Sequence, residues 1–342
     1  MNLILKNVLL TTACFLTSAA LCQGNKVGAM ELLVNPYSNS AAWAGANVAG
    51  VEGLNAVHLN IAGLTSVNGT ELTFDRITGL GSFGIRSNNL GFAQKIGEKN
   101  TIAVTGMTTS SRNEETVNPI GQSLITTSHY SNLNIGFARQ FSNSVSTGIN
   151  VKYISQTAFN IRGSGIAFDA GVQYVAGKNN QFKIGATVKN IGPDLRFGEK
   201  GSFFVLGNTP DSLQGLAAEM PALFSVGGSY EFKMQRRREV TVAAATSLTP
   251  FYKNQFKLGF HYKKKLEIMH LNAMVGYVYE NLSLDFYTHG SIPNLNGTGL
   301  TAGFSINIVD SNDQNKLGLH YAYRQTRLFA GMHSFGLKFQ LE

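Results

Sequence analysis

Seven histidines are the side chains of this chain with the clearest capacity for metal binding or acid–base chemistry. They are scattered along 342 residues, and no pair has the H-E-x-x-H spacing that places two imidazoles on one helix face. The two cysteines, Cys14 and Cys22, lie near the N-terminus, away from all of the histidines, and they match none of the sequence patterns that bind zinc. The sequence therefore predicts no metal site. The histidines are His58, His129, His261, His270, His289, His320 and His333.

Motifs for covalent or phosphoryl chemistry are also missing from the sequence. It contains no G-x-S-x-G nucleophile elbow and no phosphate-binding loop. The run Asp310-Ser311-Asn312-Asp313 begins like a calcium loop, but the required glycine and closing glutamate do not follow, so we interpret it as a polar turn. We expect no catalytic residue, no cofactor and no enzymatic activity.

The regular feature of the chain is a two-residue alternation of apolar with small or polar side chains. In the last segment Phe335, Leu337, Phe339 and Leu341 alternate with glycine and polar residues, which places every apolar side chain on one face of a strand. The same alternation occurs around Phe304 and around Phe224, where the other face carries mainly glycine, serine and other polar residues. This pattern is typical of a transmembrane antiparallel β-barrel with a lipid face and a lumen face.

Composition agrees with an all-β membrane protein. Hydrophobic residues make up 43% of the chain and charged residues only 14%, while the numbers of glycine (37), phenylalanine (22) and tyrosine (12) are high. No apolar run beyond the N-terminus is long enough for a membrane-spanning helix. A soluble β-sandwich is the alternative, but globular domains usually carry about 25% charged residues.

The N-terminus has the pattern of a signal peptide over residues 1–22. Lys6 precedes an apolar stretch, and Ala20-Leu21-Cys22 resembles a signal-peptidase site, so the mature chain is expected to begin at Gln23. Lipidation at Cys22 is the alternative. Leu21 argues against it, because the residue before a lipidated cysteine is expected to be small. The signal predicts export, and with the barrel pattern it predicts the outer membrane of a Gram-negative bacterium.

Residues 23–69 and 70–342 differ in pattern. The first segment is rich in small residues and does not alternate, so we expect a plug inside the barrel, with a periplasmic tail as the alternative. The second segment contains about fourteen predicted strands, an even number as closure usually requires; twelve or sixteen remain open. Short connections alternate with long ones at 111–126, 191–219 and 289–298, which would all lie outside the cell if both chain ends are periplasmic. The predicted strands are 71–76, 83–96, 100–110, 127–141, 145–158, 163–177, 181–190, 220–233, 238–248, 254–265, 268–288, 299–309, 315–325 and 332–342.

Basic runs at 236–238 and 263–265 contribute to the formal net charge of +8. Both fall at predicted periplasmic turns, where lysine and arginine meet lipid headgroups, proteins or solvent. We therefore predict lipid as a partner and no nucleic acid.

Two parts of the chain resemble known outer-membrane families. The stretch 44–49, followed by Asn60-Ile61-Ala62-Gly63-Leu64, is similar to the glycine-rich segment and N-P-A-G-L motif of FadL-type barrels, with Ile61 in place of the proline. The segments 317–324 and 329–337 resemble the closing hairpin of PorV-type proteins, where Y-x-Y-R is followed by G-x-H-S-x-G. Lys189-Asn190-Ile191-Gly192-Pro193 and Met220-Pro221 are further partial matches to the same branch.

The resemblance implies a FadL-like barrel with an N-terminal plug, in which Asn60, Ala62, Gly63 and Leu64 form the plug motif. It also implies a component of the type IX secretion system. Such a PorV-like barrel would receive the C-terminal domains of secreted cargo and bind translocon or attachment-complex proteins.

Two functions therefore remain open. In the first, external loops bind cargo or translocon partners, chiefly through the apolar run Phe203, Phe204, Val205 and Leu206, although this run could instead fold inward to cap the lumen. In the second, the barrel is a FadL-like transporter of small hydrophobic molecules. The predicted lumen faces weigh against the second, because they carry charged rather than apolar side chains. These are Lys152, Asp169, Lys183 and Lys189.

Overall fold

A computed structural model describes most of the chain beyond its N-terminal segment. The described residues are 27–79, 85–116, 123–158, 161–197, 217–234, 237–250, 254–280, 299–310, 315–325 and 331–341. The predicted signal peptide, both cysteines and the run 203–206 lie outside them.

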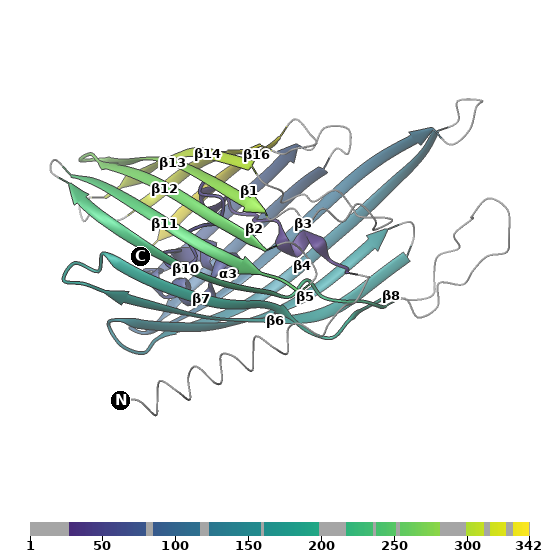
Figure 1. The fold of residues 1–342 in the computed structure, drawn as a ribbon, viewed down its shortest axis with the longest axis horizontal. Coiled ribbons are helices and arrows are strands. Elements are labelled where there is room, and N and C mark those ends of the chain that lie inside the picture. Colours follow the sequence, from purple (N-terminus) through teal and green to yellow (C-terminus); the bar gives the residue numbers. More distant parts are fainter. Residues whose placement is uncertain are drawn as a thin grey trace.

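Fourteen antiparallel strands form a closed barrel wall (Figure 1). Sequence neighbours pair around the wall, β7 pairs with β10, and β1 pairs with β16 over ten residues from Thr70↔Leu341 to Gly79↔Met332. Two short strands, β8 (Leu195–Phe197) and β9 (Ala217–Ala218), add to β6 outside this circle. The wall strands are β1 (Thr70–Gly79), β2 (Ile85–Ile96), β3 (Asn100–Thr116), β4 (Ser123–Gln140), β5 (Val145–Ala158), β6 (Ile161–Ala176), β7 (Phe182–Ile191), β10 (Leu223–Met234), β11 (Arg238–Leu248), β12 (Gln255–Lys265), β13 (Met269–Glu280), β14 (Gly299–Val309), β15 (Asn315–Arg324) and β16 (Met332–Leu341).

The outer face of the wall is apolar because the predicted alternation sets the direction of each side chain. Leu90, Ile135, Phe168 and Phe304 are among many apolar side chains that the protein leaves exposed on this face. An apolar outer surface of this extent requires lipid around it, and strands of ten residues or more are long enough to cross at a tilt. Among the described residues, no helix has the length and apolar character needed to cross a bilayer.

The two ends of the barrel differ. At one end, which we call the turn end, short connections such as 97–99, 141–144 and 177–181 join the strands. At the opposite loop end, β3 and β4 project beyond their neighbours (Figure 1). The sequence predicts a loop over 111–126, but the structure continues the hairpin to Thr116 and resumes it at Ser123, because residues at both ends of the predicted loop pair across the two strands.

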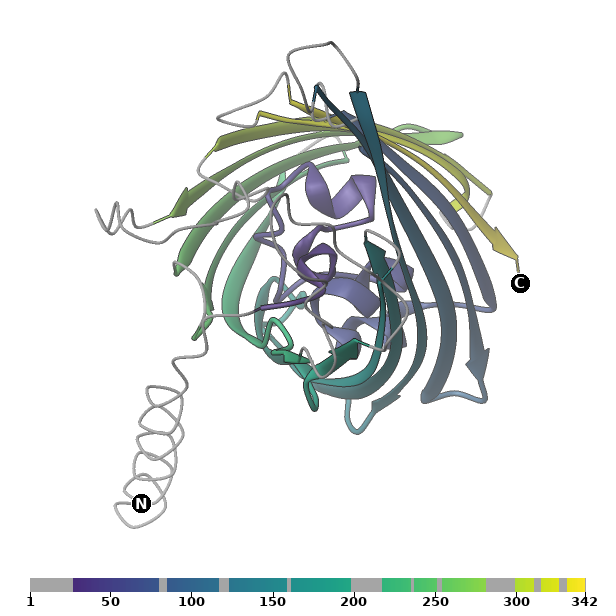
Figure 2. The same cartoon turned by 90° about the vertical axis from the view of Figure 1, so that its right-hand side faces the viewer.

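Residues 27–69 lie inside the barrel as a plug of short helices (Figure 2). Val27 pairs with Glu219 at the loop end, whereas Thr70 starts β1 at the turn end, so this segment runs the length of the lumen. The sequence places the long connections outside the cell if both chain ends are periplasmic; the described part of the chain starts at the loop end. The helical pieces are η2 (Met30–Leu33), α2 (Ser38–Ala41), η3 (Gly53–Asn55), α3 (Ala56–Leu59) and η4 (Ile61–Ser66).

Small residues allow the plug and the wall to approach closely. A Cβ atom added to Gly276 of β13 would lie 2.3 Å from the carbonyl carbon of Trp43 and 2.6 Å from the amide nitrogen of Ala44. A Cβ atom on Gly63 would lie 2.0 Å from the carbonyl oxygen of Val51. Contacts this short leave no room for a side chain, which explains why glycine occupies these two positions.

Candidate functional site

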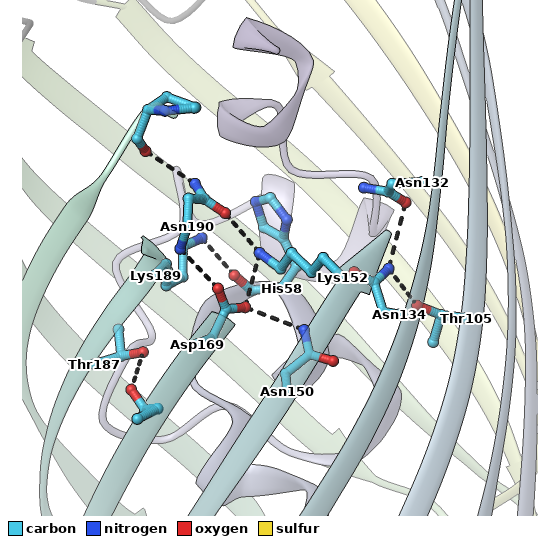
Figure 3. A network of polar contacts seen from close by, with 12 residues as sticks. His58, Thr105, Asn132, Asn134, Asn150, Lys152, Asp169, Thr187, Lys189 and Asn190 are labelled. Carbon is cyan, nitrogen blue, oxygen red and sulfur yellow. Dashed lines mark hydrogen bonds and ion pairs between the residues drawn. The ribbon is translucent and has the colours of Figure 1, made fainter. Parts of the chain in front are cut away.

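A buried ion pair lies on the inner wall beside the plug (Figure 3). Lys152 Nζ of β5 is 2.7 Å from Asp169 Oδ2 of β6, and the two side chains are only 3% and 2% exposed. Asn150 Nδ2 donates to the same carboxylate oxygen over 3.1 Å, and Lys152 Nζ also donates to Asn190 Oδ1 over 2.7 Å. Each charge therefore has the partners that burial requires.

Asn190 occupies the irregular part of this network. Its backbone has a φ of 59°, and the pairing of β6 with β7 shifts register between Phe168 and Ala170. The Asn190 amide N–H donates to Asp169 Oδ1 over 2.8 Å, and Nδ2 donates to the Pro221 carbonyl over 3.0 Å. Asparagine tolerates this left-handed conformation better than most residues, so it can join β6, β7 and the entry to β10.

Lys189 connects the wall to the plug. Its Nζ donates to the His58 carbonyl over 2.5 Å, in the last turn of α3 (Figure 3). Burial, followed by the positive charges of Lys189 and Lys152, lowers the pKa of His58 well below its ordinary value. The His58 imidazole is therefore neutral at pH 7, and the positive charge near it belongs to the lysines.

A cavity of about 60 Å³ lies on the loop side of the plug. The wall supplies Lys189, Lys257 and Arg324 to its lining, with Glu280 as the single carboxylate. The plug supplies mostly apolar groups. These are Leu33, Ala41, Ala44, Gly45, Val48 and Leu59, next to Asn35 and His58. One side of the cavity can therefore accept an apolar group and the other an anionic or polar group.

A second hollow, of about 180 Å³, lies on the turn side of the plug. Polar side chains dominate it, including an ion pair of 2.9 Å between Lys183 and Glu52, and Trp43 packs against the His261 ring with centroids 4.8 Å apart. Adjacent plug residues line opposite hollows, Val48 the loop-side one and Asn47 the turn-side one. The plug backbone thus separates the two.

The four residues of the predicted plug motif are buried at the centre of the plug. Asn60 Nδ2 donates to the carbonyls of Val48 and Val172, 3.1 and 3.0 Å away, and its Oδ1 accepts from the amide of Ala62. Asn60 thereby caps η4 without the proline. Gly63 lies against Val51, and Leu64 is fully buried. These contacts give the motif a packing role.

The predicted partner-binding run, Phe203, Phe204, Val205 and Leu206, lies outside the described residues. The four charged lumen residues named from the sequence all point inward, and all four take part in the contacts above. The sequence analysis did not select Lys257, Glu280 and Arg324. Their inward position in the alternation was the available signal, but nothing in the sequence showed that three separate strands bring them to one cavity.

Comparisons with known proteins identify the fold. No family model and no curated protein sequence matches the chain. Among solved structures, the Pseudomonas putida toluene transporter TodX aligns with a TM-score of 0.55 at 14% identity, covering 89% of this chain and 96% of TodX. The Ralstonia pickettii toluene transporter TbuX aligns with a TM-score of 0.57 at 12% identity, covering 90% of this chain and 99% of TbuX. A Pseudomonas aeruginosa FadL homologue aligns with a TM-score of 0.57 at 12% identity, covering 89% of this chain and 98% of the homologue. The chain therefore has the architecture of FadL-like barrels.

Proposed function

We propose that this chain is a non-enzymatic outer-membrane barrel of Gram-negative bacteria that takes up small hydrophobic molecules bearing a polar or anionic group. The loop-side cavity carries this proposal, because apolar plug residues face Lys189, Lys257 and Arg324 across it. The toluene transporters with the same architecture support a transport function, although the fold alone does not assign a substrate.

Passage from the loop-side cavity to the turn-side hollow requires the plug segment around Val48 to move. One side chain of the wall and one of the plug hold this segment by hydrogen bonds. Gln173 Nε2 donates to the carbonyl of Val51 over 3.1 Å, and Asn60 Nδ2 donates to that of Val48 over 3.1 Å. These hydrogen bonds would act as a latch that a bound molecule must loosen.

A reversible crosslink tests whether the plug moves. A Cβ atom on Gly227 would lie 3.3 Å from Val48 Cβ, close to the separation in a disulfide, so Val48→Cys/Gly227→Cys can join plug and wall. We expect the oxidised protein to lose uptake of a fluorescent fatty acid, which carries the anionic group that the proposal requires, and reduction to restore it. The single variants are the controls. Full uptake by the oxidised protein would contradict the proposal.

The second candidate is the PorV-like role in type IX secretion, in which the barrel binds cargo C-terminal domains and translocon or attachment-complex proteins. The closing hairpin favours it, because Gly331 has a φ of 93° and its Cβ position lies 2.6 Å from the Tyr323 hydroxyl. This close packing gives a physical reason for the paired sequence pattern that resembles PorV-type proteins. A closed plug also suits a protein that handles partners at its outer surface.

Affinity purification from the native bacterium separates the two candidates. A secretion role predicts co-purifying translocon subunits and loss of cargo secretion when residues 200–208 are deleted from a barrel that still folds. A transport role predicts normal secretion by that deletion variant and reduced uptake by the crosslinked one.

A further inference from the structure

The outer wall changes from apolar to polar near the loop end of β2 to β6. Cross-strand pairing aligns outward-facing residues of these five strands into rows. In one row Leu90, Leu133, Tyr153 and Ile166 are between 46% and 62% exposed, as expected for side chains in hydrocarbon. The next row towards the loop end is entirely polar. It consists of Asn88, Thr108, Ser131, Ser155 and Ser164.

The following row carries positive charge at both ends. Register places Arg86 opposite Ser110, Ser110 opposite His129, His129 opposite Thr157 and Thr157 opposite Arg162. Because neighbouring strands are about 4.8 Å apart, His129 lies about 10 Å from each arginine and the arginines about 19 Å from each other. None of the residues in these two polar rows is an aspartate or glutamate.

The residues of the two polar rows, except Ser164, line a hollow of about 470 Å³ on this face. Arg86, His129 and Arg162 are exposed, and Arg162 Nε donates to Ser155 Oγ over 3.3 Å, which leaves the other guanidinium N–H groups directed elsewhere. Cations without carboxylates, interspersed with hydroxyl and amide groups, are suited to phosphate and sugar hydroxyls. Their position directly above a hydrocarbon-facing row requires a ligand that is also a lipid.

We propose that this outer face binds the phosphorylated sugar headgroup of a glycolipid in the outer leaflet. Arg86 and Arg162 contact phosphate groups, the serine, threonine and asparagine side chains contact sugar hydroxyls, and the acyl chains lie along the apolar row below. The inference rests on the outer-membrane location proposed above, but it does not depend on what the lumen transports or binds.

The test is native mass spectrometry of the folded, detergent-solubilised barrel with bisphosphorylated lipid A. We expect Arg86→Glu/Arg162→Glu to weaken binding by at least about tenfold, because charge-assisted contacts are lost and repulsion replaces them. The control is Arg139→Glu, which makes the same Arg-to-Glu change at one position on the exposed outer face of β4 near the turn end and should leave binding unchanged. If the double variant fails the heat-modifiability assay for folding, Arg86→Gln/Arg162→Gln replaces it.

Binding of three other probes, compared with binding of lipid A, shows which chemical groups of the glycolipid the face recognises. Dephosphorylated lipid A and phosphatidylglycerol should both bind more weakly than lipid A, and inorganic phosphate alone should not reproduce its affinity. Equal binding of any of these probes, or unchanged lipid A binding by the double variant, would overturn the proposal. So would loss of a co-purifying protein from the double variant with lipid A binding intact, since the face would then be a protein interface. Membrane fractionation tests the outer-membrane location separately.

Discussion

The Lys152–Asp169 pair shows how single residues hold the inner wall together. Both charges are buried, and each depends on the other and on neighbouring asparagines for compensation. Removing one partner would leave the other charge buried without compensation in a surrounding of low dielectric constant. This costs more free energy than replacing both partners with apolar residues.

We therefore expect Lys152→Met to lower the free energy of unfolding by about 3–5 kcal/mol. The double variant Lys152→Met/Asp169→Asn should recover part of this loss, because the unpaired carboxylate is removed. Urea unfolding of the refolded barrel, followed by the gel mobility of the heat-modifiable form, measures both. Strictly additive losses from the two substitutions would show that the side chains are not coupled.

A pH effect is expected at the turn end, from the plug residue Glu52. The ammonium group of Lys183 lowers the pKa of Glu52 to about 2 from an ordinary value of 4.5. Since the folded value is the lower one, the stabilisation is present above pH 4.5 and disappears as the pH falls towards 2. The carboxylate side chain is 64% exposed, so the contribution is at most about 1 kcal/mol.

The comparison of Glu52→Gln with the unsubstituted protein tests this effect. The two proteins should differ slightly in stability at pH 7 and converge as the pH approaches 2, as measured by urea unfolding at each pH. A difference that persists unchanged at low pH would assign the effect of the substitution to packing.

At the scale of elements, the sequence predicts the strands well and the plug geometry poorly. Alternation places Phe224, Phe304 and Phe335 on the lipid face, where the structure finds them exposed. It also locates all fourteen wall strands. The helical pieces of the plug could not be predicted, because short segments of small residues take their conformation from contacts such as Asn60 to Val172 of β6, which are distant in sequence.

The two faces of β14 respond differently to an arginine. Ile306→Arg places a charge in hydrocarbon and should cost about 2–4 kcal/mol at the bilayer midplane. Asn307→Arg is the matched control, because Asn307 lines the turn-side hollow and an arginine there can reach water. Ser305 is unsuitable as a control, since it is only 2% exposed. Folding yield by heat-modifiable mobility should fall for Ile306→Arg only; an equal fall for both would contradict the assigned faces.

The plug and the wall also depend on close backbone approach. We expect Gly276→Ala to destabilise the seating of the plug by about 1–3 kcal/mol, because its Cβ atom would overlap the backbone at Trp43 and Ala44. Gly106→Ala is the control, since the nearest atom to its Cβ position is 4.0 Å away. Limited proteolysis of the folded protein should cleave the plug faster in Gly276→Ala alone. Equal cleavage of both variants would show that this contact does not hold the plug.

At the scale of the whole molecule, the sequence predicts a closed barrel but not the arrangement of its interior. The cavity between Lys257, Glu280 and Arg324 depends on the register of three different strands, and single-strand alternation carries no information about that register. The course of the plug from the loop end to the turn end likewise depends on the pairing of Val27 with Glu219, and no local sequence pattern predicts this pairing.

The orientation of the barrel gives the last prediction. If the loop end faces the outside of the cell, a membrane-impermeant maleimide should label Arg162→Cys in intact cells, because this exposed position lies at the loop end of β6. Lys178→Cys, at another exposed position but at the turn end, should be labelled only after the outer membrane is permeabilised, since both the bilayer and the plug stand between it and the reagent. The unsubstituted protein gives the background, which should be low because both native cysteines lie in the predicted signal peptide. Labelling of Lys178→Cys but not Arg162→Cys in intact cells would reverse the orientation and would also move the glycolipid face to the inner leaflet.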